Sequence, residues 1–111
     1  MSSWSEWLPF PDPRLGGYLV APFGPGAYEL RNKETGELVL FGSGRNVACR
    51  MSSLLPPPLG QGTRNNARKR DYVLAHLDEV EYRTLSCKTE ADAKVEESRL
   101  RLKSREYKFD T

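Results

Sequence analysis

All eight prolines of this 111-residue chain fall into two groups, one between residues 9 and 25 and one at 56–58. A proline inside a helix removes a backbone hydrogen bond and clashes with the preceding turn, so neither group lies within a helix. The prolines at 56–58 predict a loop. The first group is interspersed with aromatic residues, and we expect residues 1–23 to form an extension packed on a domain of residues 24–111. Within this extension, Tyr18–Val20 is compatible with a short strand.

The segment between the two proline groups predicts a β-hairpin. Polar and apolar residues alternate over Gly26–Asn32, which is typical of a strand with one buried face. Leu38–Phe41 is a short apolar run that fits a second, buried strand. The polar segment Lys33–Glu37 between them contains a glycine and is expected to be the turn.

Four further elements are expected after the hairpin. They are a short helix over Asn46–Leu55, a helix from about Thr63 to about Leu77, a strand over Val80–Cys87, and a helix that begins after a Thr89 cap and ends near Arg105. The resulting order, ββααβα, predicts an α+β fold similar to an α/β sandwich. Its small three-stranded sheet, mixed or antiparallel, would be flanked by helices.

Composition restricts the class of protein. No apolar run approaches the ~20 residues that a membrane span needs, and the N-terminus lacks the basic and apolar regions of a secretory signal. The two cysteines, Cys49 and Cys87, are too few for a disulfide framework. We therefore expect a cytoplasmic protein without a membrane partner, and the sequence leaves its oligomeric state open.

Charge is distributed unevenly along the chain. The net charge is +2, yet residues 45–70 contain six basic residues and no acidic one. The six are Arg45, Arg50, Arg64, Arg68, Lys69 and Arg70. A block of uncompensated positive charge attracts a polyanion such as nucleic acid. The alternative is a solvated basic surface that acidic residues balance from elsewhere in the fold.

Familiar metal and phosphate motifs are absent from the sequence. There is no cysteine pair at zinc spacing, and the single histidine, His76, does not form a histidine metal cluster. The glycine-rich motifs that hold nucleotide phosphates do not occur. A chemical function therefore depends on polar residues placed where a core would prefer apolar ones.

Glu97 is the clearest of these residues. On a helix it shares a face with Ala93 and Leu100. A carboxylate on such a face costs free energy unless it is paired or binds a cation. The simplest partner is Arg101, four residues further along the helix.

Arg50 and Tyr28 are two further candidates. Arg50 lies on the same stripe of its expected helix as Val47 and Met51. An arginine in that position stacks, pairs with a buried acid or holds a phosphate. Tyr28 lies in the first hairpin strand, where a tyrosine is most often a core residue with a satisfied hydroxyl.

Taken together, these residues form a pattern that resembles the GIY-YIG nuclease superfamily. Eleven residues separate Gly26-Ala27-Tyr28 from Leu40-Phe41-Gly42, similar to the two motifs that name the family. The stretch from Ser43 to Met51 resembles the segment that carries the family's arginine. Ala93–Leu100 is similar to the family's Ala-x-x-x-Glu-x-x-Leu, and the element order agrees with that fold.

The resemblance implies cleavage of DNA phosphodiester bonds with one Mg²⁺ or Mn²⁺ ion. Glu97 would bind the metal, Arg50 would hold the scissile phosphate, and Tyr28 would orient or deprotonate the attacking water. The other basic residues would bind the nucleic-acid backbone, with RNA as an open alternative to DNA. These residues are Arg45, Arg64, Arg68, Lys69 and Arg70.

The chain also departs from the family pattern. Leu40 stands where the second motif has a tyrosine, and alternation would turn Phe41 to the opposite face of the sheet. Asp110 takes the place of a late asparagine in Tyr107–Asp110, which resembles the family's Pro-x-Tyr-Asn. Further groups that could serve the site are Tyr18, Tyr72 and His76.

Three functions are consistent with the sequence. The first is an active metal-dependent DNA endonuclease, and the second is a GIY-YIG-like module that binds nucleic acid without cleaving it. The third is an interaction protein that docks a partner through its aromatic N-terminal arm. The first would fail if a structure placed Arg50 and Glu97 on opposite sides of the sheet.

Overall fold

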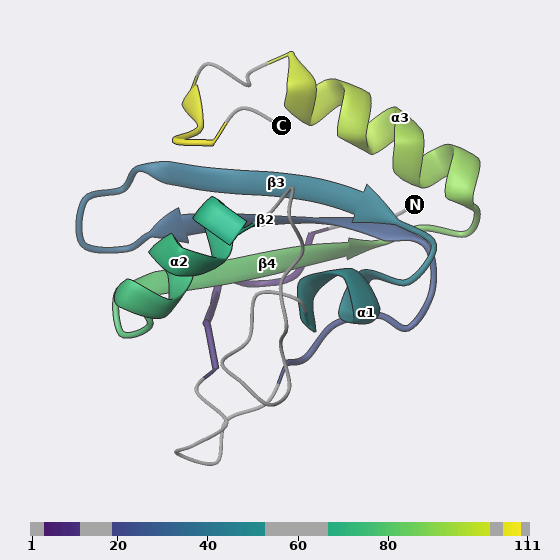
Figure 1. Ribbon diagram of the computed structural model, residues 1–111. Helices are drawn as coiled ribbons and strands as arrows, with labels where there is room; N and C mark the ends of the chain where they lie inside the picture. Colours follow the sequence, from purple (N-terminus) through teal and green to yellow (C-terminus); the bar gives the residue numbers. More distant parts are fainter. Residues whose placement is uncertain (1–3, 12–18, 53–66, 103–105, 110–111) are drawn as a thin grey trace.

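A four-stranded antiparallel sheet with strand order β1-β4-β2-β3 is central to the computed structural model of the protein (Figure 1). The structure describes residues 4–11, 19–52, 67–102 and 106–109. The strands are β1 (Leu8–Pro9), β2 (Gly26–Asn32), β3 (Leu38–Gly44) and β4 (Val80–Ser86). The described residues thus form a small α+β domain.

Helices cover both faces of this sheet. Figure 1 shows α1 (Val47–Ser52) and α2 (Ala67–Ala75) on one face and α3 (Glu90–Arg101) on the other. The expected cap of α3 is confirmed, because the Thr89 hydroxyl accepts a hydrogen bond from the Asp92 backbone N–H at 3.1 Å. No helix in the described part of the chain is long and apolar enough to cross a membrane.

Alternation along β2 divides the core into two layers. Tyr28 and Leu30 belong to the larger cluster, which includes residues of α1 and α2. Ala27 packs on the opposite face, in a cluster with Leu100 of α3. Helices cover both faces of β2, and β4 and β3 cover both of its edges, so six of its seven residues are buried.

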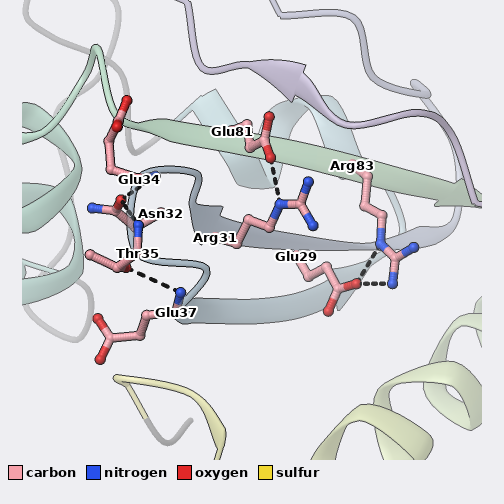
Figure 2. Close-up of polar contacts among 8 residues, drawn as sticks. All are labelled: Glu29, Arg31, Asn32, Glu34, Thr35, Glu37, Glu81 and Arg83. Atoms are coloured by element: carbon pink, nitrogen blue, oxygen red, sulfur yellow. Dashed lines mark hydrogen bonds and ion pairs between the residues drawn. The ribbon is translucent and has the colours of Figure 1, made fainter.

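The hairpin turn and the start of β2 depend on two glycines and one asparagine. Gly36 adopts a positive φ of 76°, which favours glycine. The Asn32 side chain accepts hydrogen bonds from the backbone N–H groups of Glu34 and Thr35 and closes the turn (Figure 2). At the other end of β2, a Cβ on Gly26 would lie 2.1 Å from the Leu85 carbonyl oxygen. Only glycine permits this close approach of β2 and β4.

A buried charge network lies on the face of the sheet that carries α3. The Glu29 side chain is fully buried and pairs with Arg83, its directly opposite neighbour on β4 (Figure 2). The Tyr107 hydroxyl donates a second hydrogen bond to the same carboxylate. Two partners on one buried carboxylate satisfy a charge that would otherwise be costly in the interior.

The N-terminal arm packs on this network through its two tryptophans. The Trp4 and Trp7 ring centroids lie 4.7 and 4.8 Å from the guanidinium carbon of Arg83. The Trp7 ring also lies 4.1 Å from the guanidinium carbon of Arg31, which pairs with Glu81 (Figure 2). The tryptophans and arginines thus stack in alternation and hold residues 4–7 against the sheet.

Three expectations about the elements require correction. The sheet has four strands because Leu8–Pro9 pairs with Tyr82 and Glu81 of β4. Residues 19 and 20 form no strand, and Tyr18 lies outside the described residues. The second helix ends at Ala75 rather than near Leu77, and its expected first residues lie outside the described ranges.

Candidate active site

Tyr28 lies at the centre of the candidate site, and its ring lies over the neighbouring strand. The residue is paired with Gly42 of β3 and is only 9% exposed. A Cβ on Gly42 would lie 2.5 Å from the Tyr28 hydroxyl oxygen. The glycine of the second motif therefore leaves the space that the tyrosine of the first motif occupies.

Glu97 approaches the same end of the sheet from α3. The Ser43 hydroxyl, near the end of β3, donates a hydrogen bond to Glu97 Oε2 at 3.0 Å. Arg101 Nη2 donates to Oε1 at 3.2 Å, which confirms the expected pair one helical turn away. The Glu97 side chain is 31% exposed, so solvent ions can reach its carboxylate.

Ser43 was not among the residues selected from the sequence. Alternation along β3 places Ser43 on the same face as Phe41, which packs against α3. Strand alternation therefore places Ser43 on the face that packs against the Glu97 helix, and this pattern could have identified Ser43 from the sequence.

Arg50 lies on α1 and is exposed rather than buried. The prediction that Arg50 shares the buried face of its helix is therefore wrong, although Val47 and Met51 on that face are buried as predicted. The six-residue helix lies over the end of the sheet, and the Arg50 stem passes Gly44 instead of entering the core. Its Cγ and Cδ lie 3.4 Å from the place where a Cβ of Gly44 would be.

The three residues act on one another across the edge of the sheet. Burial raises the pKa of Tyr28; the Arg50 charge lowers that pKa and the Glu97 charge raises it. The Arg50 and Glu97 charges thus have opposite effects on the pKa of Tyr28. The helices that carry Arg50 and Glu97 lie on opposite faces of the sheet. At the level of the helices this counts against the nuclease, which required both residues on one side. Their side chains nevertheless lie beside adjacent residues at the end of the edge strand β3: the Arg50 stem lies beside Gly44, and Glu97 accepts a hydrogen bond from Ser43.

The second-motif position supplies no hydroxyl to this site. Leu40 is 1% exposed and belongs to the core cluster that contains Tyr28. The predicted opposite orientation of Phe41 is confirmed, because its ring packs on the α3 side at 4.8 Å from the Tyr107 ring. A second aromatic hydroxyl, if the chemistry needs one, has to come from elsewhere.

The structure places two of the proposed auxiliary residues far from Tyr28. The Tyr72 hydroxyl accepts a hydrogen bond from Asn32 at the other end of β2, four residues from Tyr28. His76 stacks on the Tyr72 ring at 4.1 Å between centroids. Tyr18 and Asp110, the other two auxiliary candidates, lie outside the described residues.

The structure describes five residues of the basic block. Arg45 and Arg68 are exposed, and Lys69 and Arg70 are half-buried, whereas Arg64 lies outside the described ranges. Burial lowers the pKa of Lys69, and the positive charge of Arg50 lowers it further. Lys69 of α2 and Arg50 of α1 therefore contribute positive charge to one region.

The donor set at Glu97 fits a hard divalent cation that retains most of its water. Mg²⁺ commonly binds through one or two carboxylates and a substrate phosphate. Glu97 offers one partly exposed carboxylate whose present partners are a hydroxyl and a surface arginine. Among the described residues, no group of three or more His, Cys, Asp or Glu side chains forms a metal cage.

Comparisons of the chain with protein-family models, curated proteins and solved structures give no match. Its function is therefore argued from the geometry and chemistry of the site.

Proposed function

We propose that this protein is a metal-dependent endonuclease that hydrolyses phosphodiester bonds in DNA. The observation that carries the proposal is geometric: Tyr28, Glu97 and Arg50 lie against three consecutive residues at the end of the edge strand β3. These are Gly42, Ser43 and Gly44 respectively. A guanidinium, a carboxylate and a phenol are suited to hold a phosphate, a metal ion and a water molecule, which are the components of metal-dependent phosphodiester hydrolysis. The resemblance of the motifs to the GIY-YIG superfamily supports the same reaction.

Glu97 would hold one Mg²⁺ or Mn²⁺ ion at its partly exposed carboxylate. When bound, such an ion supplies Lewis-acid polarisation of the phosphoryl oxygen and stabilises the leaving oxygen. The hydrogen bond from Ser43 fixes one carboxylate oxygen, so the side chain is oriented before metal binds.

In this proposal Tyr28 orients the attacking water molecule and does not deprotonate it. Because burial raises the pKa of Tyr28, its phenol is neutral at physiological pH. A neutral hydroxyl accepts one hydrogen bond and donates another, which suits the positioning of a water molecule. The ring is held by packing over Gly42, so this position is fixed before substrate binds.

In this proposal Arg50 binds the scissile phosphate. The residue is exposed, and a guanidinium is permanently charged with planar donors that match two phosphate oxygens. Positive charge from this group stabilises the charge that develops on the phosphate during hydrolysis. Arg45, Arg68 and Lys69 extend the positive surface along the nucleic-acid backbone.

A nucleic-acid-binding module without cleavage is the second candidate, and Leu40 favours it. The family's second tyrosine is replaced by a side chain that is fully buried in the core. Binding of nucleic acid through the basic residues does not require that hydroxyl.

Cleavage of supercoiled plasmid separates the two candidates. The nuclease nicks the plasmid with Mg²⁺ or Mn²⁺ and does not do so in EDTA, and Glu97→Ala abolishes nicking while DNA affinity is retained. Absence of nicking by the wild-type protein, together with salt-dependent DNA binding, would instead support the binding module.

A further inference from the structure

Phe23 is a large aromatic residue on the surface beside the candidate site. Its side chain is 85% exposed, and it lies in the segment just before β2. Exposed single apolar residues are common and need no explanation by themselves. Two further features of Phe23 indicate a ligand: its backbone is fixed by hydrogen bonds, and basic residues lie nearby.

The backbone around Phe23 is fixed on both sides. The Pro22 carbonyl accepts a hydrogen bond from the Ala48 N–H at 2.9 Å, and the Gly24 carbonyl accepts one from the Val47 N–H at 3.2 Å. Figure 1 shows this segment passing beside α1 before it enters β2. The Pro25 carbonyl is in turn bound by the Cys87 N–H at 2.8 Å. An exposed ring on a fixed backbone binds with little loss of conformational entropy.

Basic residues lie on the α1 side of Phe23, whereas the charges of Glu96 and Asp92 act on Cys87, which binds the Pro25 carbonyl on the other side. The segment is hydrogen-bonded to the first turn of α1, which is preceded by the exposed Arg45 and carries the exposed Arg50. The basic block that starts at Arg45 contains no acidic residue. An apolar protein surface would gain little from this charge, whereas a polyanion with flat apolar bases gains from both the ring and the arginines.

We propose that Phe23 stacks on an unpaired nucleobase of the bound nucleic acid. The face of a base in an intact duplex is covered by its neighbours, so stacking requires a single strand, a gap or an opened step. The protein then binds DNA with an unpaired nucleotide more tightly than intact duplex. This inference rests on nucleic-acid binding at the proposed site but not on cleavage there.

The test is a set of binding titrations in EDTA, where cleavage does not occur. Fluorescence anisotropy is measured with labelled single-stranded DNA, duplex with a one-nucleotide gap, and intact duplex of equal length. Wild type is compared with Phe23→Ala and Phe23→Trp. The matched control is Leu102→Ala, because Leu102 is 89% exposed at the C-cap of α3, on the other face of the sheet from α1. Circular dichroism establishes that each variant is folded.

We expect Phe23→Ala to weaken binding to single-stranded and gapped DNA by roughly 5- to 100-fold, the loss typical of one base–aromatic stack. Binding to intact duplex changes less than about twofold, while Phe23→Trp retains the preference and Leu102→Ala binds like wild type. Equal affinities of wild type and Phe23→Ala, or equal losses on all three DNAs, would overturn the inference. The inference would also be overturned if sedimentation showed that the wild-type protein is a dimer and that Phe23→Ala is a monomer, because the ring would then contact a second copy of the chain.

Failure of this inference is distinguishable from failure of the proposed function. Metal-dependent nicking without any effect of Phe23→Ala on binding overturns the stacking role alone. Phe23-dependent binding without nicking overturns the nuclease alone, and a wild-type protein that binds none of the three DNAs overturns both.

Discussion

The ring of Tyr28 on β2 lies over Gly42 on β3, its partner in the antiparallel pair. The tyrosine of the first motif and the glycine of the second are thus one packing unit, although thirteen residues separate them. Burial of the ring between the strands and α1 holds the hydroxyl at the edge of the sheet, where the charges of Arg50 and Glu97 act on it.

Gly42→Ala is expected to displace the Tyr28 ring and to lower the free energy of unfolding by about 1–3 kcal/mol. The new Cβ would lie within 2.9 Å of three ring or hydroxyl atoms of Tyr28, which exceeds what a packed core accepts. The matched control is Gly24→Ala, because nothing lies within 4 Å of a Cβ at that position. Denaturant unfolding measures both variants, and equal midpoints would contradict the packing relationship.

Arg101→Gln is expected to strengthen binding of Mn²⁺ by up to about fivefold, since the exposed Arg101–Glu97 pair contributes about 1 kcal/mol at most. Metal and arginine compete for the same carboxylate oxygen, and removal of the arginine charge leaves that oxygen to the ion. Arg99→Gln is the control, because Arg99 forms an equivalent pair with Glu96 on the same helix. Isothermal titration gives the affinities; an equal effect of both substitutions would mean that only the net charge matters.

Much of the fold could be predicted from local patterns in the sequence. The hairpin, the Thr89 cap and the opposite orientations of Leu40 and Phe41 follow from alternation and from capping, which involve only neighbouring residues. The two-residue strand β1 could not be found in this way, because its pairing with Tyr82 depends on a contact across more than seventy residues. A strand this short carries no periodicity of its own.

The candidate site was only partly predictable for the same reason. Motif spacing identified Tyr28, Arg50 and Glu97, but their arrangement around an edge strand depends on the order of strands in the sheet. The exposure of Arg50 follows from the position of α1 over the end of the sheet. Tyr72 and His76 share an expected helix with the basic residues. In the structure, however, Tyr72 on α2 and His76 just after it lie at the hairpin end of β2.

Ionisation of the Tyr107 hydroxyl is expected to make the free energy of unfolding fall at alkaline pH. Burial and the hydrogen bond to Glu29 raise the pKa of Tyr107 far above its ordinary value. The unfolded chain therefore loses this proton first as pH rises, so the free energy of unfolding is maintained below about pH 10 and falls above it.

Tyr107→Phe is expected to cost about 1–3 kcal/mol at pH 7, because the buried Glu29 carboxylate loses a hydrogen-bond donor. The variant should also lose less stability than wild type between pH 10 and pH 11, a range set by the ordinary tyrosine pKa of about 10. Urea unfolding at each pH measures both effects. Parallel pH profiles of the two proteins would show that this hydroxyl is not the titrating group.

Trp7→Ala is expected to reduce the free energy of unfolding by about 1–2 kcal/mol through loss of two cation–π contacts. The ring lies between Arg31 and Arg83, whose carboxylate partners remain in place after the substitution. Trp7→Phe keeps an aromatic face there and should recover part of the loss. Thermal unfolding of both variants tests this, and an Ala variant as stable as wild type would mean that the arm adds nothing to the fold.

The most direct test of the nuclease assignment compares Glu97→Gln with Glu96→Gln in metal-dependent plasmid nicking. Both substitutions remove one negative charge from adjacent positions on α3, and each carboxylate is paired with an arginine on the same helix. Only Glu97 also accepts a hydrogen bond from Ser43 at the end of the edge strand. We predict that Glu96→Gln nicks DNA like wild type, whereas Glu97→Gln is inactive and still binds DNA. Equal nicking by the two variants would contradict the proposed metal site.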